Sequence, residues 1–199
     1  MAHFFVKTIL YPVMRLLFVK EIKGLNNLPK KTPYIIAANH ASYIDGPLLL
    51  LTFLWHKNKT VHFFIYKKMF TTVFRRFVFW TWFDQIKENH SVKKALEFLE
   101  NNEIVGIFPE GTRTKTGKIQ KAAGTGLGVL AVKTRLPVIP IAIKGTFELW
   151  PRTEKWPKFQ RIVTIKIGKP MKFNLQMNKK NYKSITSKVM HQIGKLKNA

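Results

Sequence analysis

The feature that most constrains the fold is an alternation of short apolar, β-branched runs with longer segments of helical spacing. Strand character is found over residues 34–38, 61–66, 104–108, 138–144 and 161–167. Helical spacing is found over residues 47–55, 91–99, 122–134 and 179–196, and in part over 67–83. Such alternation predicts an α/β fold, a single domain with a mostly parallel central sheet flanked by helices.

The two ends of the chain are expected to add helices to this core. We expect residues 1–25 to be an N-terminal membrane-associating helix and connector, 26–175 the α/β core, and 176–199 a basic C-terminal helix. Lys7 and Arg15 fall on one side of a helix over residues 4–19, and apolar side chains cover most of the rest. This pattern favours a helix in the lipid headgroup region. A helix packed on its own domain is the alternative.

Two further segments are predicted to lack regular structure. Residues 20–33 form a polar stretch with several lysines and two prolines, which indicates a connector. The insert over residues 147–160 contains two Trp-Pro pairs and indicates a loop.

The charge of the chain indicates an anionic partner. The formal net charge is +25, from 35 basic and 10 acidic residues, and 28 of the basic residues are lysine. Nucleic acid and anionic lipid headgroups are both candidates. Base-edge recognition favours arginine, so the excess of lysine favours unspecific attraction to a charged surface. Lysine as an ordinary solvated residue explains part of the excess equally well.

The sequence excludes several kinds of site. Cysteine is absent, so disulfides, thiolate metal sites and cysteine nucleophiles are excluded. Five of the six histidines are scattered without the spacing of metal ligands, and no metal site is expected.

The first candidate site is the segment Asn39-His40-Ala41-Ser42-Tyr43-Ile44-Asp45, between a predicted strand and a predicted helix. Open α/β folds place active sites at the carboxyl ends of strands. Gly46-Pro47 argues against a continuous helix here, so a turn can return the Asp45 carboxylate to the His40 imidazole. A histidine held in this way can act as a general base toward an alcohol. Ser42 is a second candidate nucleophile, although a capping role suits it better.

The second candidate site is Phe108-Pro109-Glu110-Gly111-Thr112-Arg113, which follows the third predicted strand. Gly111 permits a turn in which the backbone approaches a ligand. Arg113 offers a planar fork for phosphate. Glu110 is expected to orient the site rather than to transfer protons, because nothing in the sequence indicates that it is buried.

Together the two segments resemble the glycerolipid acyltransferase family, in particular the 1-acylglycerol-3-phosphate acyltransferases. That family carries an Asn-His-x-x-x-x-Asp block and a downstream Pro-Glu-Gly-Thr-Arg block. The resemblance runs in order over residues 20–146 and includes Leu-Pro-Val-Ile-Pro-Ile at residues 136–141. One position departs from the family pattern: Lys87 stands where arginine is expected, and the upstream glycine is missing.

The resemblance implies an O-acyltransferase with His40 and Asp45 as the catalytic pair. Substrate binding is then expected from Glu110, Gly111, Thr112, Arg113 and Lys87, with backbone N–H groups of the motif turns stabilising the oxyanion. No cofactor is expected. The acyl donor is acyl-CoA or acyl carrier protein, and the acceptor is a lysophospholipid, most simply 1-acyl-glycerol-3-phosphate giving phosphatidic acid. Lys87 lacks the arginine fork, so the acceptor headgroup stays open.

The expected working place is an anionic membrane surface on the cytoplasmic face, with the protein peripheral or monotopic and without nucleic acid. The aromatic and basic stretch over residues 74–83 is either a lipid-facing element or part of the core. Two alternatives remain. One is an acyltransferase for another lysolipid or for glycerol 3-phosphate. The other is a non-catalytic basic module that binds membrane or nucleic acid.

Overall fold

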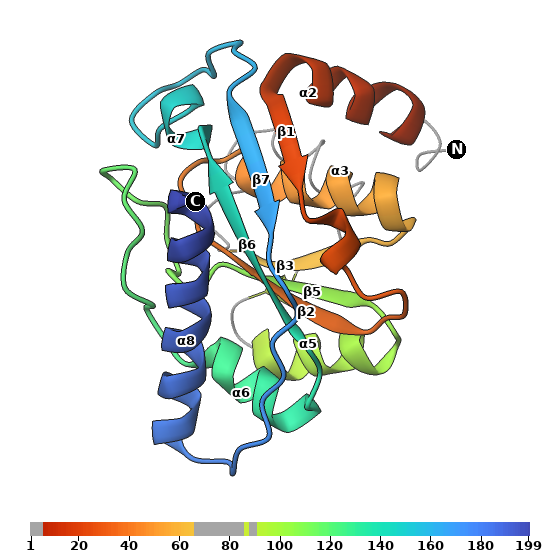
Figure 1. Ribbon diagram of the computed structural model, residues 1–199, viewed down its shortest axis with the longest axis vertical. Helices are drawn as coiled ribbons and strands as arrows, with labels where there is room; N and C mark the ends of the chain where they lie inside the picture. Colours follow the sequence, from red (N-terminus) through yellow and green to blue (C-terminus); the bar gives the residue numbers. More distant parts are fainter. Residues whose placement is uncertain (1–5, 66–85, 88–90) are drawn as a thin grey trace.

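A seven-stranded sheet forms the centre of the molecule (Figure 1). The computed structural model describes residues 6–65, 86–87 and 91–199. Within them the strand order is β1-β7-β6-β2-β5-β3-β4, and every neighbouring pair is parallel except β6 with β7. The mostly parallel sheet is thus confirmed. The strands are β1 Val19–Lys23, β2 Tyr34–Ala38, β3 Val61–Ile65, β4 Ile86–Lys87, β5 Ile104–Ile107, β6 Val138–Lys144 and β7 Val163–Ile167.

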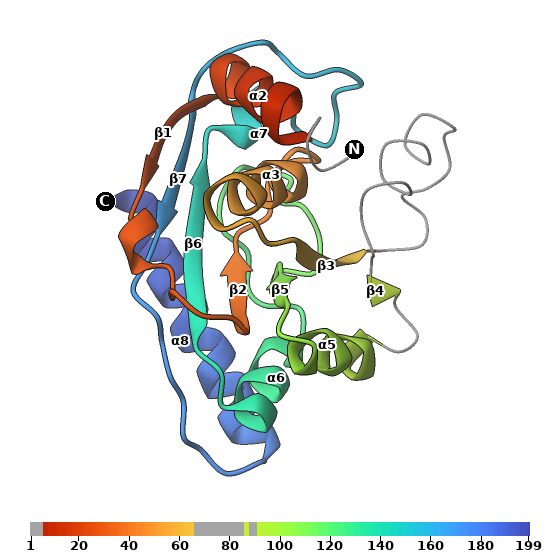
Figure 2. The same ribbon diagram turned by 90° about the vertical axis from the view of Figure 1, so that its right-hand side faces the viewer.

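Helices cover both faces of the sheet (Figure 2). They are the π-helical turn η1 Val6–Leu10, α2 Tyr11–Phe18, the 3-10 turn η2 Leu25–Asn27, α3 Asp45–Lys57, α5 Ser91–Glu100, α6 Gly126–Thr134, α7 Thr146–Leu149 and α8 Lys179–Asn198. Among the described helices, none combines the length and the apolar character that crossing a membrane requires.

Two apolar clusters sandwich the sheet. Alternate residues of β2 point to opposite faces, so Ile36 packs with α3 while Ile35 packs with α5, α6 and α8. All five residues of β2 are buried, which is expected for a central parallel strand covered on both faces. β2 is therefore a rigid base for the residues that follow it.

The prediction of a connector over residues 20–33 is wrong at its start. Residues 20–23 belong to β1, which pairs in parallel with β7 at the edge of the sheet. Two lysines and one glutamate conceal this strand in the sequence, yet such residues are common on edge strands, where one side meets solvent.

Several other boundaries also differ from the sequence prediction. Helix α3 begins at Asp45 rather than at Pro47, because proline is tolerated within the first turn, where its missing N–H has no helical partner. Helix α6 begins at Gly126 rather than at residue 122. The expected loop over residues 147–160 begins as the short helix α7. The expected partial helix over residues 67–83, with its aromatic stretch, lies outside the described residues.

Candidate active site

The two predicted segments meet at the carboxyl edge of the sheet. β2 and β5 are parallel neighbours, so the segment after Ala38 and the segment after Ile107 leave the sheet side by side. The backbone N–H of Thr114 donates to the carbonyl of His40 at 2.9 Å, which joins the two segments directly. Residues 74 positions apart in the chain therefore share one site.

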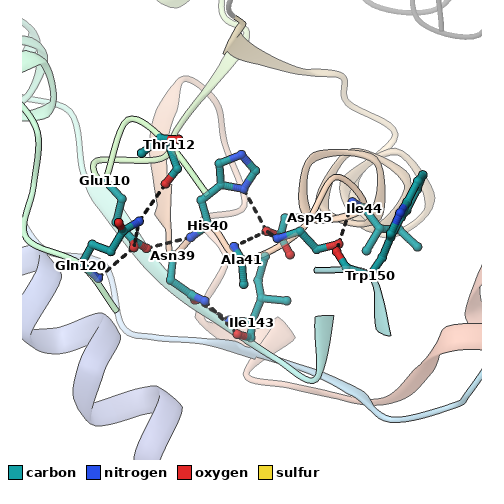
Figure 3. A network of polar contacts seen from close by, with 11 residues as sticks. Asn39, His40, Ala41, Ile44, Asp45, Glu110, Thr112, Gln120, Ile143 and Trp150 are labelled. Carbon is teal, nitrogen blue, oxygen red and sulfur yellow. Dashed lines mark hydrogen bonds and ion pairs between the residues drawn. The ribbon is translucent and has the colours of Figure 1, made fainter. Parts of the chain in front are cut away.

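His40 and Asp45 form the predicted pair (Figure 3). The Nδ1 atom of His40 lies 2.9 Å from the Oδ2 atom of Asp45. A turn over residues 40–44 brings the carboxylate back to the ring, as the sequence predicts. The His40 side chain is 17% exposed, and the Asp45 side chain is fully buried. One face of the imidazole stacks on Phe108, with 4.1 Å between ring centroids.

Asp45 is held by the backbone as well as by the histidine. Its Oδ2 atom accepts hydrogen bonds from the N–H groups of Ala41 and Ser42, each at 2.7 Å. It is also the first residue of α3, where the helix dipole favours a negative charge. The carboxylate therefore has a fixed position, so it can fix the proton of His40 on Nδ1.

Ser42 has a structural role in this turn. Its hydroxyl donates to the carbonyl of Trp150 at 2.7 Å and accepts a long hydrogen bond from the N–H of Ile44. The side chain is fully buried. These contacts stabilise the turn, but Ser42 does not cap α3, whose N-cap residue is Ile44 and has no side-chain cap hydrogen bond. They leave the hydroxyl poorly placed to act as a nucleophile.

Glu110 is buried, contrary to the assumption made from the sequence. It is 3% exposed, and its Oε1 atom accepts the backbone N–H of His40 at 2.8 Å. Its Oε2 atom accepts the backbone N–H and the side-chain amide of Gln120, at 2.9 and 3.2 Å. The carboxylate thus ties the loop after β5 to the turn that carries His40, which favours the orienting role over proton transfer.

Two residues for which the sequence predicts no role also hold the site. The Asn39 amide donates to the carbonyl of Ile143 at 2.9 Å and accepts its N–H at 2.7 Å, which fastens the end of β2 to β6. The amide of Gln120 also donates to the carbonyl of Thr112 at 3.0 Å. A signal for Asn39 was present, since a polar side chain directly after a buried strand needs a partner.

Arg113 lies against the same turn. Its guanidinium carbon is 3.3 Å from the centroid of the Tyr43 ring, a cation–π arrangement. Burial lowers the pKa of Arg113, the nearby charge of Arg152 adds to the lowering, and Tyr43 and Asp45 oppose it. Within the described residues, its buried Nη1 atom has no hydrogen-bond partner. This leaves a partly buried cationic donor available to an anionic ligand.

For the remaining predicted site residues, Gly111, Thr112 and Lys87, the structure gives fewer contacts. Gly111 has a φ of 68° and donates its N–H to the carbonyl of Phe108, so it makes the turn that the sequence suggested. Thr112 is exposed beside it. Lys87 is in β4, at the edge of the sheet remote from β1. The binding roles of these residues stay predictions.

Comparison with known proteins shows which family this chain belongs to. A family model described as "Acyltransferase" matches residues 20–144, which is more than half of the chain and includes both motif segments. The chain belongs to the acyltransferase family. The predicted resemblance is therefore confirmed at the level of the family.

Relatives and a solved structure agree with this assignment. A chloroplastic 1-acyl-sn-glycerol-3-phosphate acyltransferase of Brassica napus is 33% identical over 137 residues, 66% of this acyltransferase-family chain and 39% of that protein. A 1-acyl-sn-glycerol-3-phosphate acyltransferase of Saccharomyces cerevisiae is 31% identical over 176 residues, 81% of this chain and 55% of that protein. The chain thus spans 39% and 55% of the lengths of these two relatives.

The crystal structure of the 1-acyl-sn-glycerophosphate acyltransferase PlsC from Thermotoga maritima has a similar fold. The TM-score is 0.76 and the sequence identity is 24%. The match covers 98% of this chain and 79% of the PlsC chain. At this identity the similarity supports the fold.

Proposed function

We propose that the protein transfers a fatty acyl chain from a thioester to the free hydroxyl of a lysophospholipid, with 1-acyl-glycerol-3-phosphate as acceptor. The observation that carries the proposal is the 2.9 Å contact between His40 Nδ1 and the buried Asp45 carboxylate. With the Nδ1 proton held by Asp45, Nε2 keeps its lone pair and can accept a proton. In Figure 3 this second nitrogen is turned away from Asp45.

The reaction follows from this arrangement. His40 Nε2 removes the hydroxyl proton of the acceptor as the oxygen attacks the thioester carbonyl. The new C–O bond forms, the C–S bond breaks, and the proton on Nε2 passes to the leaving thiolate. No covalent acyl-enzyme is required, which fits the buried and hydrogen-bonded Ser42 hydroxyl.

Arg113 supplies the contact for the acceptor phosphate in this proposal. Its unpartnered Nη1 atom and its position over Tyr43 support the role. A charge-assisted bond from a fixed guanidinium would hold the acceptor so that its hydroxyl faces His40. Lys87 is proposed as a second cation, and acyl-CoA or acyl carrier protein as the donor.

The N-terminal segment supports a membrane location. The side chains of Ile9, Val13, Leu16 and Leu17 are exposed, while Tyr11 and Phe18 face the protein. An unpartnered apolar stripe on a helix is typical of a segment that lies in a membrane interface. We therefore propose that α2 rests on the bilayer from which the lysophospholipid enters.

The test is an assay of thiol release with lysophosphatidic acid, glycerol 3-phosphate and lysophosphatidylcholine, using both donors, with products identified by mass spectrometry. We expect turnover with lysophosphatidic acid and a loss of about 10³-fold or more in His40→Ala. His191→Ala is the control, because His191 is exposed on α8. Turnover that survives in His40→Ala, or vesicle binding without any transfer, would overturn the proposal in favour of another base or a non-catalytic module.

A further inference from the structure

A second set of exposed apolar side chains lies at the same end of the molecule as α2. It belongs to the segment over residues 150–162, here named the Trp156 loop, which connects α7 to β7. Figures 1 and 2 both show this loop running beside α2. Trp156 is 81% exposed and Phe159 is 73% exposed, and Ile162 is also exposed. Water is an unfavourable environment for such large rings, so their exposure calls for an explanation.

The charges of the loop indicate what covers it. Four basic residues flank the aromatic side chains, against the one acidic residue Glu154, and all four are exposed: Arg152, Lys155, Lys158 and Arg161. Tryptophan and phenylalanine between lysines and arginines match the boundary between lipid headgroups and acyl chains, where rings enter the apolar layer and cations meet anionic headgroups.

The loop and α2 form one continuous surface. The rings of Phe159 and Phe18 stack with 5.8 Å between centroids. The Arg161 side chain donates from Nε to the carbonyl of Val19 at 3.1 Å, and Arg15 donates to the same carbonyl at 2.8 Å. These contacts fix the loop against the end of the helix that carries Val13 and Leu16.

The base of the loop is attached to the catalytic turn. The carbonyl of Trp150 accepts the Ser42 hydroxyl, and the Trp150 ring packs on Tyr43 with 5.4 Å between centroids. Inside the loop, the indole N–H of Trp150 donates to the carbonyl of Glu154, and the N–H of Lys158 donates to the carbonyl of Leu149. The exposed rings are therefore held in place with respect to His40.

We propose that the Trp156 loop is a second membrane-binding element, which inserts Trp156 and Phe159 into the interface of an anionic bilayer beside α2. Contact at two places orients the molecule on the bilayer, whereas one amphipathic helix alone leaves rotation about its axis free. The consequence, that acceptor lipid reaches the site from this side, rests on the proposed function. The membrane contact itself does not.

The experiment measures binding of the full chain to phosphatidylcholine vesicles with and without phosphatidylglycerol, by co-sedimentation. Trp156→Ser is the main variant, because a side chain this exposed contributes little to folding. We expect its affinity for the mixed vesicles to fall about tenfold, since the indole no longer leaves water. The control is Met177→Ser, which removes another exposed apolar side chain from the segment between β7 and α8 at the opposite end of the molecule (Figure 1).

Each outcome is decisive. A loss in Trp156→Ser with wild-type binding in Met177→Ser supports the inference. Equal binding of all three proteins, equal losses in both variants, or no binding by the wild type overturns it. A loop that binds nucleic acid instead would show the Trp156→Ser loss with a DNA duplex and not with vesicles. The same proteins assayed with a monodisperse short-chain acceptor separate the two proposals: absent turnover overturns the proposed function and leaves the vesicle result standing.

Discussion

At the scale of single residues, the site depends on the one Asp45 oxygen atom that faces His40. Asp45 uses one oxygen atom to accept from the imidazole and from two backbone N–H groups. An asparagine whose oxygen takes the place of this atom keeps the two backbone contacts and still accepts from Nδ1, but it carries no charge. The neutral amide cannot stabilise the imidazolium that forms when His40 takes up the proton of the acceptor, so Nε2 becomes a weaker base.

Asp45→Asn is therefore expected to lower kcat by about 10³–10⁴-fold while the protein stays folded. Asp45→Ala also removes the acceptor for the two backbone N–H groups, so we expect it to unfold at a lower temperature than Asp45→Asn. Steady-state kinetics and thermal melts of the two variants check both statements. An asparagine variant with wild-type kcat would show that the negative charge of Asp45 is not needed for the reaction.

The sequence predicted the contacts of the site that join residues close together in the chain. His40 and Asp45 are five residues apart, and Gly46-Pro47 indicated the turn between them. The contacts of Glu110 with His40 and of Asn39 with Ile143 join residues 70 and 104 positions apart. Such contacts depend on which strands are neighbours, and composition and spacing do not determine the strand order.

At the scale of elements, the packing of α6 on α8 depends on one glycine. A Cβ atom added at Gly128 would lie 2.2 Å from the backbone carbonyl oxygen of Tyr182 and 2.6 Å from its Cα atom. The neighbour is backbone, so it cannot move aside as a flexible side chain would. Residue 128 must therefore be glycine for the two helices to approach this closely.

Gly128→Ala is expected to destabilise the fold, because overpacking of about 3 kcal/mol exceeds the gain in helix propensity of about 1 kcal/mol. Gly126→Ala is the matched control on the same helix, since nothing lies within 4 Å of its added Cβ. Urea unfolding of both variants measures the difference. Equal stability of the two would mean that α6 and α8 are further apart than described.

The contact between α2 and α3 is expected to depend on pH through His56. Partial burial lowers the pKa of His56, and the charges of Arg15 and Lys57 add to the lowering. Its Nε2 atom lies 3.1 Å from the Tyr11 hydroxyl oxygen. A neutral imidazole can accept a hydrogen bond from that hydroxyl. Because the pKa is lower in the folded protein than the ordinary 6.5, folding favours the neutral ring.

This contribution to stability is fully present above about pH 6.5 and is lost as the pH falls through the lower folded pKa. We expect the thermal midpoint of the wild type to fall more steeply between pH 7.5 and 5.5 than that of His56→Gln. His191→Gln should follow the wild type. Parallel curves for wild type and His56→Gln would mean that His56 takes no part in the pH dependence.

Buried strands and helices were predicted from the sequence more accurately than exposed ones. β2 and β6 were predicted at their observed bounds, because central parallel strands are continuous apolar runs. β1 was missed, because Lys20 and Glu21 are adjacent and break the alternation of polar and apolar residues that indicates a strand. This strand owes its place to pairing with β7. The helix α7 was missed because its four residues are too few to show a period.

At the scale of the whole molecule, two forces would act when the protein meets a bilayer. The net charge of +25 attracts it to anionic lipid over a distance set by salt. The exposed apolar side chains of α2 and the Trp156 loop act only on contact, and their burial is nearly independent of moderate salt. A measurement over a range of salt concentrations can separate the two contributions.

From about 0.1 to 1 M NaCl the screening length falls from about 10 to about 3 Å, so affinity for anionic vesicles should fall steeply. The affinity of the Trp156→Ser variant should fall with the same slope as that of the wild type, and it should be weaker at every salt concentration. Lys155→Gln with Lys158→Gln should have a shallower slope, because each lysine near the surface contributes about 1 kcal/mol of screened attraction. The control is Lys179→Gln with Lys180→Gln, at the start of α8, where the figures place the chain far from α2. Both double variants could change the slope of affinity against salt concentration equally. In that case the positive charge would attract the bilayer from the whole surface of the protein, and the Trp156 loop would have no special part in binding.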